Sequence, residues 1–111
     1  MPKGSHLGDL EELTLLAVLG LGENADGGSI RTELAEQANR SVSVSTIYVT
    51  LMRLEEKGYA TSWKGEPSGR RGGKARRMYG VTPEGRRALE SVRDVRTAMW
   101  SGVDAEAVSG G

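Results

Sequence analysis

A segment near the middle of the chain carries side chains suited to contact with the edges of base pairs. If residues 44–58 form a helix, Ser45, Thr46, Val49 and Arg53 lie on the side opposite an apolar stripe. Hydroxyls can donate or accept hydrogen bonds at base edges, valine can contact a thymine methyl group, and arginine can bind guanine or a phosphate. These residue types at this spacing favour a helix that reads duplex DNA, and they leave open a face that contacts another protein.

The segment that positions these side chains reads as a capped helix with one buried side. The apolar stripe consists of Ile47, Leu51 and Leu54. Either Ser43 or Ser45 is expected to cap the start of the helix, and Gly58 its end. Ser43 is a further candidate for DNA contact. Tyr48 is next to the stripe, so it either packs against the body of the protein or brings its hydroxyl to a phosphate.

Two shorter helices are predicted before this segment. The first spans residues 9–20, is capped by Asp9, and is apolar nearly all round in its second half, LTLLAVLGL. Residues 22–28 are expected to form a loop, and Gly28 or Ser29 to open a second helix over residues 30–38. A polar connector at residues 39–41 then leads into the central helix. This order is typical of a helix-turn-helix.

After Gly58 the apolar period changes from that of a helix to that of a strand. Residues 59–64 and 77–82 are predicted strands, and the glycine-rich stretch between them is predicted to be the tip of a hairpin. A hairpin in this position is a wing, and this one is basic, because residues 64–77 hold six basic residues against Glu66. The candidate DNA contacts of the wing are Lys64, Arg70, Arg71, Lys74, Arg76 and Arg77.

The last predicted helix begins at Pro83, with Thr82 as its N-cap. Apolar residues recur along it every three or four positions. They either pack within the chain or bind a second copy of it, and the second is expected because three helices and a hairpin already enclose a core. The residues predicted to form this dimer contact are Leu89, Val92, Val95, Met99 and Trp100. Trp100 is either part of the interface core or part of the lining of an effector pocket. Residues 102–111 lose the pattern and are expected to fray, and residues 1–8 to form a flexible arm.

Composition limits the remaining function classes. A chain of 111 residues without cysteine is expected to be one soluble, cytoplasmic domain, with no disulfide, no thiolate metal site and no membrane segment. The sequence offers few candidate catalytic side chains, because it has no cysteine and its one histidine, His6, lies in the predicted arm. A phosphate-loop pattern fails at Ser68 and Ala75. We therefore expect no enzyme activity, no cofactor and no metal.

The chain resembles PadR-type bacterial transcriptional regulators. The most specific matches are STIYVTLMRLEEKGY at residues 45–59 and RRMYGVTPEG at residues 76–85, with a Gly/Arg-rich wing between them. The resemblance implies a winged helix-turn-helix domain, a C-terminal helix that forms a homodimer, and repression of target genes that is often relieved by phenolic acids, drugs or other signals. It places this chain in the short subfamily, although Val49 departs from the usual proline or threonine, so no base preference is carried over.

Together these features predict a mainly α fold with a small β-hairpin, an α+β arrangement. Residues 9–82 would form the winged helix domain, with the wing at about 59–82, and residues 83–101 the dimerisation helix. The predicted function is a homodimeric repressor that binds double-stranded DNA and responds to a small-molecule effector of unidentified structure. The alternative is a winged helix module that binds RNA, with Trp63 or Tyr79 as stacking platforms, or one that binds a protein.

Overall fold

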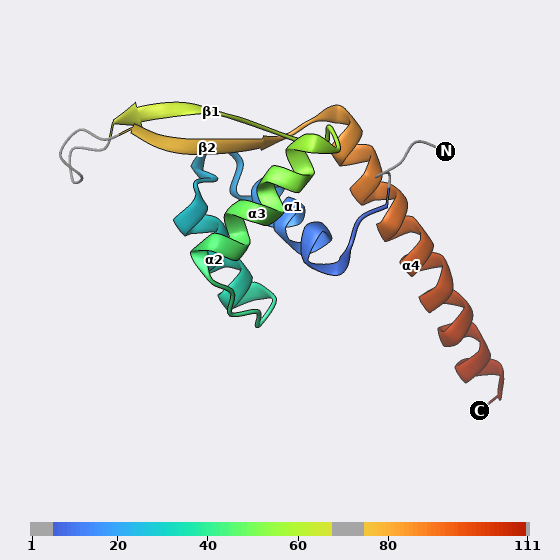
Figure 1. Ribbon diagram of the computed structural model, residues 1–111. Coiled ribbons are helices and arrows are strands. Elements are labelled where there is room, and N and C mark those ends of the chain that lie inside the picture. Colours follow the sequence, from blue (N-terminus) through green and yellow to red (C-terminus); the bar gives the residue numbers. More distant parts are fainter. Residues whose placement is uncertain (1–5, 68–74, 111) are drawn as a thin grey trace.

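The computed structural model describes residues 6–67 and 75–110, with the side chains of residues 67, 75 and 106–110 left out. Helices account for most of these residues, and two antiparallel strands form a hairpin (Figure 1). The elements in chain order are α1 (Asp9–Leu21), the 3-10 turn η1 (Gly22–Asn24), α2 (Gly27–Gln37), α3 (Val44–Glu56), β1 (Ala60–Pro67), β2 (Ala75–Val81) and α4 (Pro83–Gly110). This arrangement confirms the predicted mainly α fold with a small hairpin.

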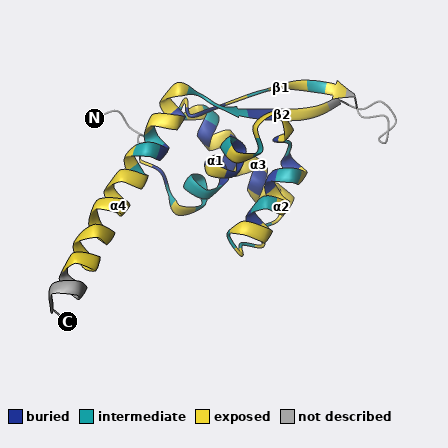
Figure 2. Ribbon diagram, turned by 180° about the vertical axis from the view of Figure 1, so that it is seen from behind, coloured by how far each residue is buried: buried dark blue, intermediate teal, exposed yellow. Residues whose placement is uncertain are grey.

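The core lies where α1, α2 and α3 meet, as the dark blue segments in Figure 2 show. Ile47 and Leu51 belong to this core, and Leu54 to a second cluster that also holds Leu15 and Leu89. All three are 0% exposed, so the predicted stripe of α3 is fully buried. Burying a side chain of this size contributes roughly 1.5–3 kcal/mol relative to leaving it in water. Ile30 and Leu34 of α2 share the cluster of Ile47 and Leu51. The buried stripe therefore fixes which side of α3 is left facing outward.

Side chains set the helix starts, in two cases one or more residues from the predicted position. Gly8, and not Asp9, is the N-cap of α1, and its N–H donates to the Glu11 carboxylate at 2.7 Å. Asp26 caps α2 by accepting from the Ser29 N–H at 2.8 Å, so α2 begins before the expected Gly28 or Ser29. For α3 the cap is Ser43, one of the two serines predicted. A carboxylate or hydroxyl in such a position stabilises a helix by about 1 kcal/mol.

The hairpin is held to the helical body at its base. In its register Trp63 pairs with Met78 and Lys64 with Arg77, and both strands reach further toward the tip than predicted. On the other edge of β2, the Tyr79 N–H donates to the Ala25 carbonyl at 2.9 Å. The bond from Tyr79 to Ala25 attaches the hairpin to the segment that precedes α2.

The junction between the hairpin and α4 is closely packed. The Thr82 hydroxyl accepts from the Gly85 N–H at 3.0 Å, which makes Thr82 the predicted cap, and it donates to the Gly58 carbonyl at 2.6 Å. A Cβ atom on Gly85 would lie 2.2 Å from the Tyr59 carbonyl oxygen. Only glycine fits this approach, so the direction in which α4 leaves the body is set here.

Residues 6–8 are not a loose arm, which corrects the expectation for this part of residues 1–8. Leu7 is buried against Leu15 and Leu54, and the Lys57 ammonium donates to the His6 carbonyl at 2.6 Å. Lys57 also forms an ion pair with Glu11 at 2.7 Å. The sequence pattern missed this attachment because a single leucine between polar residues has no period. Residues 1–5 lie outside the described part of the chain.

Helix α4 runs away from the body after its first turns and continues to Gly110 (Figure 1). The expectation that residues 102–111 fray is therefore corrected for residues 102–110. The helix continues because this stretch contains alanine and glutamate, which favour helix, and no proline. Within residues 6–67 and 75–110, no helix is both long and apolar enough to cross a membrane.

Candidate nucleic-acid interface

The outer face of α3 brings together the side chains predicted to contact bases. Ser45, Thr46, Val49 and Arg53 are all exposed, and residues 44–53 contain no acidic side chain. Met52 is 59% exposed next to Val49, which is 48% exposed. Met52 is not among the predicted DNA contacts, although its position on the helix, away from the buried stripe, indicates an exposed side chain. The face is partly apolar, and Arg53 is its one charged residue.

At the start of α3 the hydroxyls form a small hydrogen-bonded group. The Ser43 Oγ lies 2.8 Å from the Thr46 Oγ1 and 3.2 Å from the Ser45 Oγ, and it accepts from the Thr46 N–H at 3.1 Å. Each hydroxyl has one hydrogen to donate and two lone pairs, so these contacts leave capacity for an outside partner. The group is thus held in place and remains able to bind a base edge or a phosphate.

Arg53 extends the same face about 12 Å along the helix from Ser45, given a rise of 1.5 Å per residue. Among the described residues its guanidinium has no hydrogen bond or ion pair, and neither Glu36 nor Glu56 is bound to it. Its charge is still felt at Glu11, where it is one of several groups that lower the carboxyl pKa. Arg53 is therefore available to an external acceptor.

Tyr48 both packs against the body and reaches the surface. A Cβ atom on Gly27 would lie 2.8 Å from the Tyr48 hydroxyl, so glycine at this position makes room for the tyrosine ring over the start of α2. The side chain nevertheless stays 44% exposed. The hydroxyl end of the Tyr48 ring therefore packs over Gly27, and contact of this hydroxyl with a phosphate stays a prediction.

Of the predicted wing contacts, Lys64, Arg76 and Arg77 are described and exposed. Arg76 forms an ion pair with Asp26 at 2.8 Å. Arg77 donates to the Ser62 hydroxyl at 2.8 Å, and that hydroxyl donates to Glu55 of α3 at 2.6 Å. Both arginines lie near the tip-side end of β2, and these contacts tie that end of the strand to the helical body. Arg70, Arg71 and Lys74 lie outside the described residues.

An open groove of about 940 Å³ separates the start of α2, the start of α3 and the start of β2. Val44 and Tyr48 line one side of it, Ser29 and Thr32 another, and Arg76 the third. The helix that presents the predicted base contacts and the strand that presents the arginines thus border one depression. A nucleic-acid backbone lying in this groove would be close to both.

Two ionisable groups near this groove have shifted pKa values. Burial by itself raises the pKa of Asp26, but hydrogen bonds from Ser29 and Arg76 outweigh it and bring the pKa below its ordinary value. The pKa of Tyr79 is raised, first by burial and then by the nearby Tyr48 and Glu55. Asp26 is therefore ionised and Tyr79 neutral near pH 7, so Arg76 faces a full negative charge.

The residues predicted to form the dimer contact separate into two groups along α4. Leu89 is only 5% exposed and Val92 is half-buried, because both face α1 and the start of β1 within the same chain. Leu89 thus belongs to the protomer core, which corrects its assignment. Val95, Met99 and Trp100 are 58%, 70% and 66% exposed. Leu16 of α1, which the sequence analysis did not select, is also exposed and lies beside Trp100 in a second groove, of about 480 Å³, between α1 and α4.

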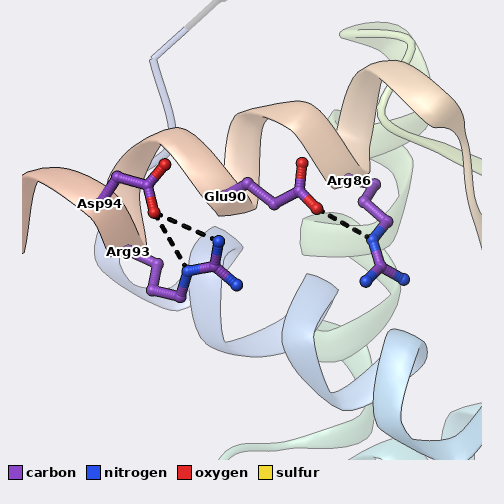
Figure 3. A network of polar contacts seen from close by, with 4 residues as sticks. All are labelled: Arg86, Glu90, Arg93 and Asp94. Carbon is purple, nitrogen blue, oxygen red and sulfur yellow. Dashed lines mark hydrogen bonds and ion pairs between the residues drawn. The ribbon is translucent and has the colours of Figure 1, made fainter. Parts of the chain in front are cut away.

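Charged residues on α4 pair mostly with one another. Figure 3 shows Arg86 bound to Glu90 at 3.2 Å and Arg93 bound to Asp94 at 3.2 Å. Pairs this exposed contribute about 0–1 kcal/mol each. These ion pairs make the sides of α4 on which they lie hydrophilic, so the apolar side is the one suited to burial.

The sequence model of one protein family matches most of the chain. This family is described as the transcriptional regulator PadR-like family, and its model matches residues 15–91, which is more than half of the chain. The chain belongs to the PadR-like family. Members of this family are transcriptional regulators and not enzymes, and the match confirms the resemblance read from the sequence. A search of curated protein sequences finds no match to the chain.

Solved structures agree with membership of the PadR-like family. A PadR-like transcription factor from Bacteroides fragilis superposes with a TM-score of 0.70 at 24% identity, covering 86% of this chain and 87% of the other. A PadR family regulator from Eggerthella lenta gives 0.66 at 27% identity, with 86% and 79% covered. Bacillus subtilis PadR, solved in complex with operator DNA, gives 0.60 at 24% identity, with 74% of this chain and 46% of that chain covered. These likenesses confirm the winged helix fold.

Proposed function

We propose that this PadR-like protein is a homodimeric repressor that binds a pseudo-palindromic operator in double-stranded DNA. The observation that carries the proposal is the outer face of α3. It has exposed hydroxyls, Val49 and an Arg53 that no other described residue binds, but no acid over residues 44–53. A solvated helix face ordinarily carries glutamate and lysine, whereas base edges in the major groove need this mixture. The basic wing next to this face supports the same assignment.

In the proposed complex the first turns of α3 enter the major groove and the wing follows the adjacent backbone. Ser43, Ser45, Thr46 and Val49 would contact base edges or the nearest phosphates, with Arg53 further along the groove. Wing arginines and lysines would contact phosphates, which contribute affinity without sequence information. Tyr48 would place its hydroxyl at a phosphate beside the start of α2.

Dimerisation is proposed to occur through the exposed apolar side of α4. Val95, Met99 and Trp100 would be buried against a second copy, together with Leu16 of α1. Large apolar side chains grouped on a helix that projects from a small body favour such a contact. Two copies of α3 would then lie in successive major grooves, roughly 34 Å apart, as two half-sites of an inverted repeat require.

Release of the operator by a small molecule is the last part of the proposal. The groove between α1 and α4, which Trp100 lines, is the place where such an effector would contact the dimerisation helix. The chemistry of the effector is left open, as is the alternative that Trp100 is only interface core. We propose that the protein acts in the cytoplasm, where the DNA of a bacterium is found.

RNA binding is less well supported than DNA binding. It required Trp63 or Tyr79 to offer a ring for base stacking. Tyr79 is only 6% exposed, so its ring is not accessible. Trp63 is 45% exposed but lies across Gly80, which places it on the outer side of the hairpin. The RNA alternative therefore depends on the ring of Trp63 alone.

The test is selection of bound fragments from random-sequence duplex DNA, followed by affinity measurement on the selected and on scrambled DNA at two salt concentrations. The proposal predicts an inverted repeat and a specificity ratio of about 10³ or more. Weak binding that vanishes with salt and shows no motif would contradict sequence-specific recognition. Tight binding to single-stranded RNA in its place would favour the alternative.

A further inference from the structure

Two carboxylates, those of Asp26 and Glu33, line the groove that the proposed DNA backbone would occupy. Asp26 lines this groove together with Tyr48 and Arg76. A negative charge on a surface that receives phosphates weakens binding by repulsion. A carboxylate at this position is therefore expected to have a role that compensates for the repulsion, and the contacts of Asp26 indicate which role this is.

Both carboxylate oxygens of Asp26 are engaged, and each holds a different element. Oδ1 accepts from the Ser29 N–H at 2.8 Å and so caps α2, while Oδ2 accepts from Nη1 of Arg76 at 2.8 Å. Asp26 also forms an isolated β-bridge with Met78 of β2. The carboxylate is therefore fixed relative to α2 by its cap and relative to β2 by the backbone.

The two partners of this ion pair differ in exposure. The Asp26 side chain is 18% exposed and that of Arg76 is 41% exposed, so the carboxylate is the inner partner and the guanidinium the outer one. Only Nη1 of Arg76 is used by Asp26, and among the described residues no other group binds the remaining guanidinium nitrogens. A guanidinium that uses one nitrogen for the carboxylate keeps its other N–H groups available to an outside acceptor.

We propose that Asp26 is a positioning residue for DNA binding, which holds Arg76 at the mouth of the groove so that its outer edge meets a backbone phosphate. The inference rests on the proposed function. Holding the side chain in advance removes much of the rotamer entropy that a free arginine loses on binding. The gain in preorganisation outweighs the repulsion from a carboxylate that Arg76 already neutralises.

This proposal and simple electrostatics predict opposite signs for the same substitution. Asp26→Asn removes a negative charge from the groove, so repulsion alone predicts tighter DNA binding. Loss of positioning predicts weaker binding, by about three- to tenfold, because Arg76 is freed to many rotamers. Asp26→Ser serves as a second variant, since serine is also a good helix cap but is too short to reach Arg76.

Glu33 provides the matched control. It lines the same groove and has no ion pair among the described residues. Glu33→Gln thus removes an equal charge without removing an arginine contact, and is expected to leave DNA binding unchanged or to tighten it. A shared weakening of Asp26→Asn and Glu33→Gln would overturn the positioning role, because it would not depend on Arg76.

The experiment measures operator affinity of the full chain across a salt series for wild type, Asp26→Asn, Asp26→Ser, Arg76→Gln and the double variant Asp26→Asn/Arg76→Gln. Arg76→Gln should lower the slope of log affinity against log salt by roughly 0.9, the value for one lost phosphate contact. Asp26→Asn should weaken binding and keep the wild-type slope, since all cations remain. In the Arg76→Gln background, Asp26→Asn should cause no further weakening.

Each other outcome has a definite meaning. Equal or tighter binding by Asp26→Asn and Asp26→Ser would overturn the positioning role while leaving the proposed function intact. Additive weakening in the double variant would also overturn it, because the two residues would then act independently. Absence of DNA binding by the wild type would instead contradict the proposed function itself. Thermal unfolding of each variant excludes loss of the fold as the cause, and Arg76→Gln breaks the pair without touching the cap.

Discussion

Helices α3 and α4 are both amphipathic, but they use their apolar residues in opposite ways. The apolar stripe of α3 is completely buried within one chain, with Leu51 at 0% exposure. On α4 the large apolar residues beyond the first turns are outside, with Met99 at 70% and Trp100 at 66%. What α3 leaves exposed is a mixed surface fit for a polar partner, and what α4 leaves exposed is a surface fit for burial. The contrast indicates that a single chain buries the apolar residues of α3 but not those in the outer part of α4.

Truncation of the buried stripe should have the largest effect. Leu51→Ala removes a fully buried side chain from the centre of the core, and should lower the free energy of unfolding by about 2–5 kcal/mol. Met99→Ala should change it only at protein concentrations where the wild type is dimeric. Denaturant unfolding at several concentrations measures both. Equal, concentration-independent losses in the two variants would contradict the contrast between the helices.

The junction between the two regions should be the next most sensitive. Gly85→Ala would place a Cβ atom 2.2 Å from the Tyr59 carbonyl oxygen, so the start of α4 or the preceding turn must shift. We expect a loss of about 1–3 kcal/mol, as for other overpacked sites, measured by denaturant unfolding. Gly102→Ala is the control within the same helix, because nothing lies within 4 Å of a Cβ there. That variant should be neutral or slightly stabilising, because alanine is the better helix former.

A charge on the exposed apolar side of α4 tests whether a second chain covers it. Met99→Asp should give monomers in sedimentation experiments, because an unpaired carboxylate in an apolar contact is costly to bury. Ala98→Asp adds the same charge one residue away, about 100° around the helix, and should remain dimeric. A Met99→Asp variant that still sediments as a dimer would remove this side of α4 from the interface.

Acid should weaken the attachments of α3 and its neighbours more than those of α4. Glu11 and Asp26 have ordinary pKa values of 4.5 and 3.8, and in the folded chain both are lower, since hydrogen bonds and nearby cations outweigh the rise from burial. Their contributions to stability are therefore complete above the ordinary values and are lost as the pH falls through the lowered ones. The unfolding free energies of wild type and Glu11→Gln should therefore converge as the pH falls through the lowered pKa of Glu11. A constant difference at all pH values would exclude ionisation of Glu11 as the cause.

Much of the domain could be predicted from local sequence. Ile47, Leu51 and Leu54 at helical spacing, Ser43 before them and Gly58 after them determine α3, and alternation after Gly58 determines the hairpin. These features depend on neighbours within a few residues, which a sequence displays directly.

Other features depend on contacts between distant segments. Leu89 and Met99 belong to the same predicted stripe, yet one is buried and the other exposed, because the packing at Gly85 directs α4 away from the body. The Asp26 contact with Arg76 joins residues 50 positions apart, and Leu7 is buried in a cluster with residues of α1, α3, β1 and α4. Neither the angle of α4 nor such pairs has a local signal.

The most direct test of the central claim compares the DNA motif selected by wild type with those selected by Thr46→Val, Val49→Ala and Met99→Ala. If α3 reads bases and α4 only joins chains, the first two variants should change the preferred base at one position of each half-site, while Met99→Ala should lower affinity and keep the motif. An unchanged motif in both α3 variants would contradict base reading by this face, and a changed motif in Met99→Ala would contradict the division of roles between the two helices.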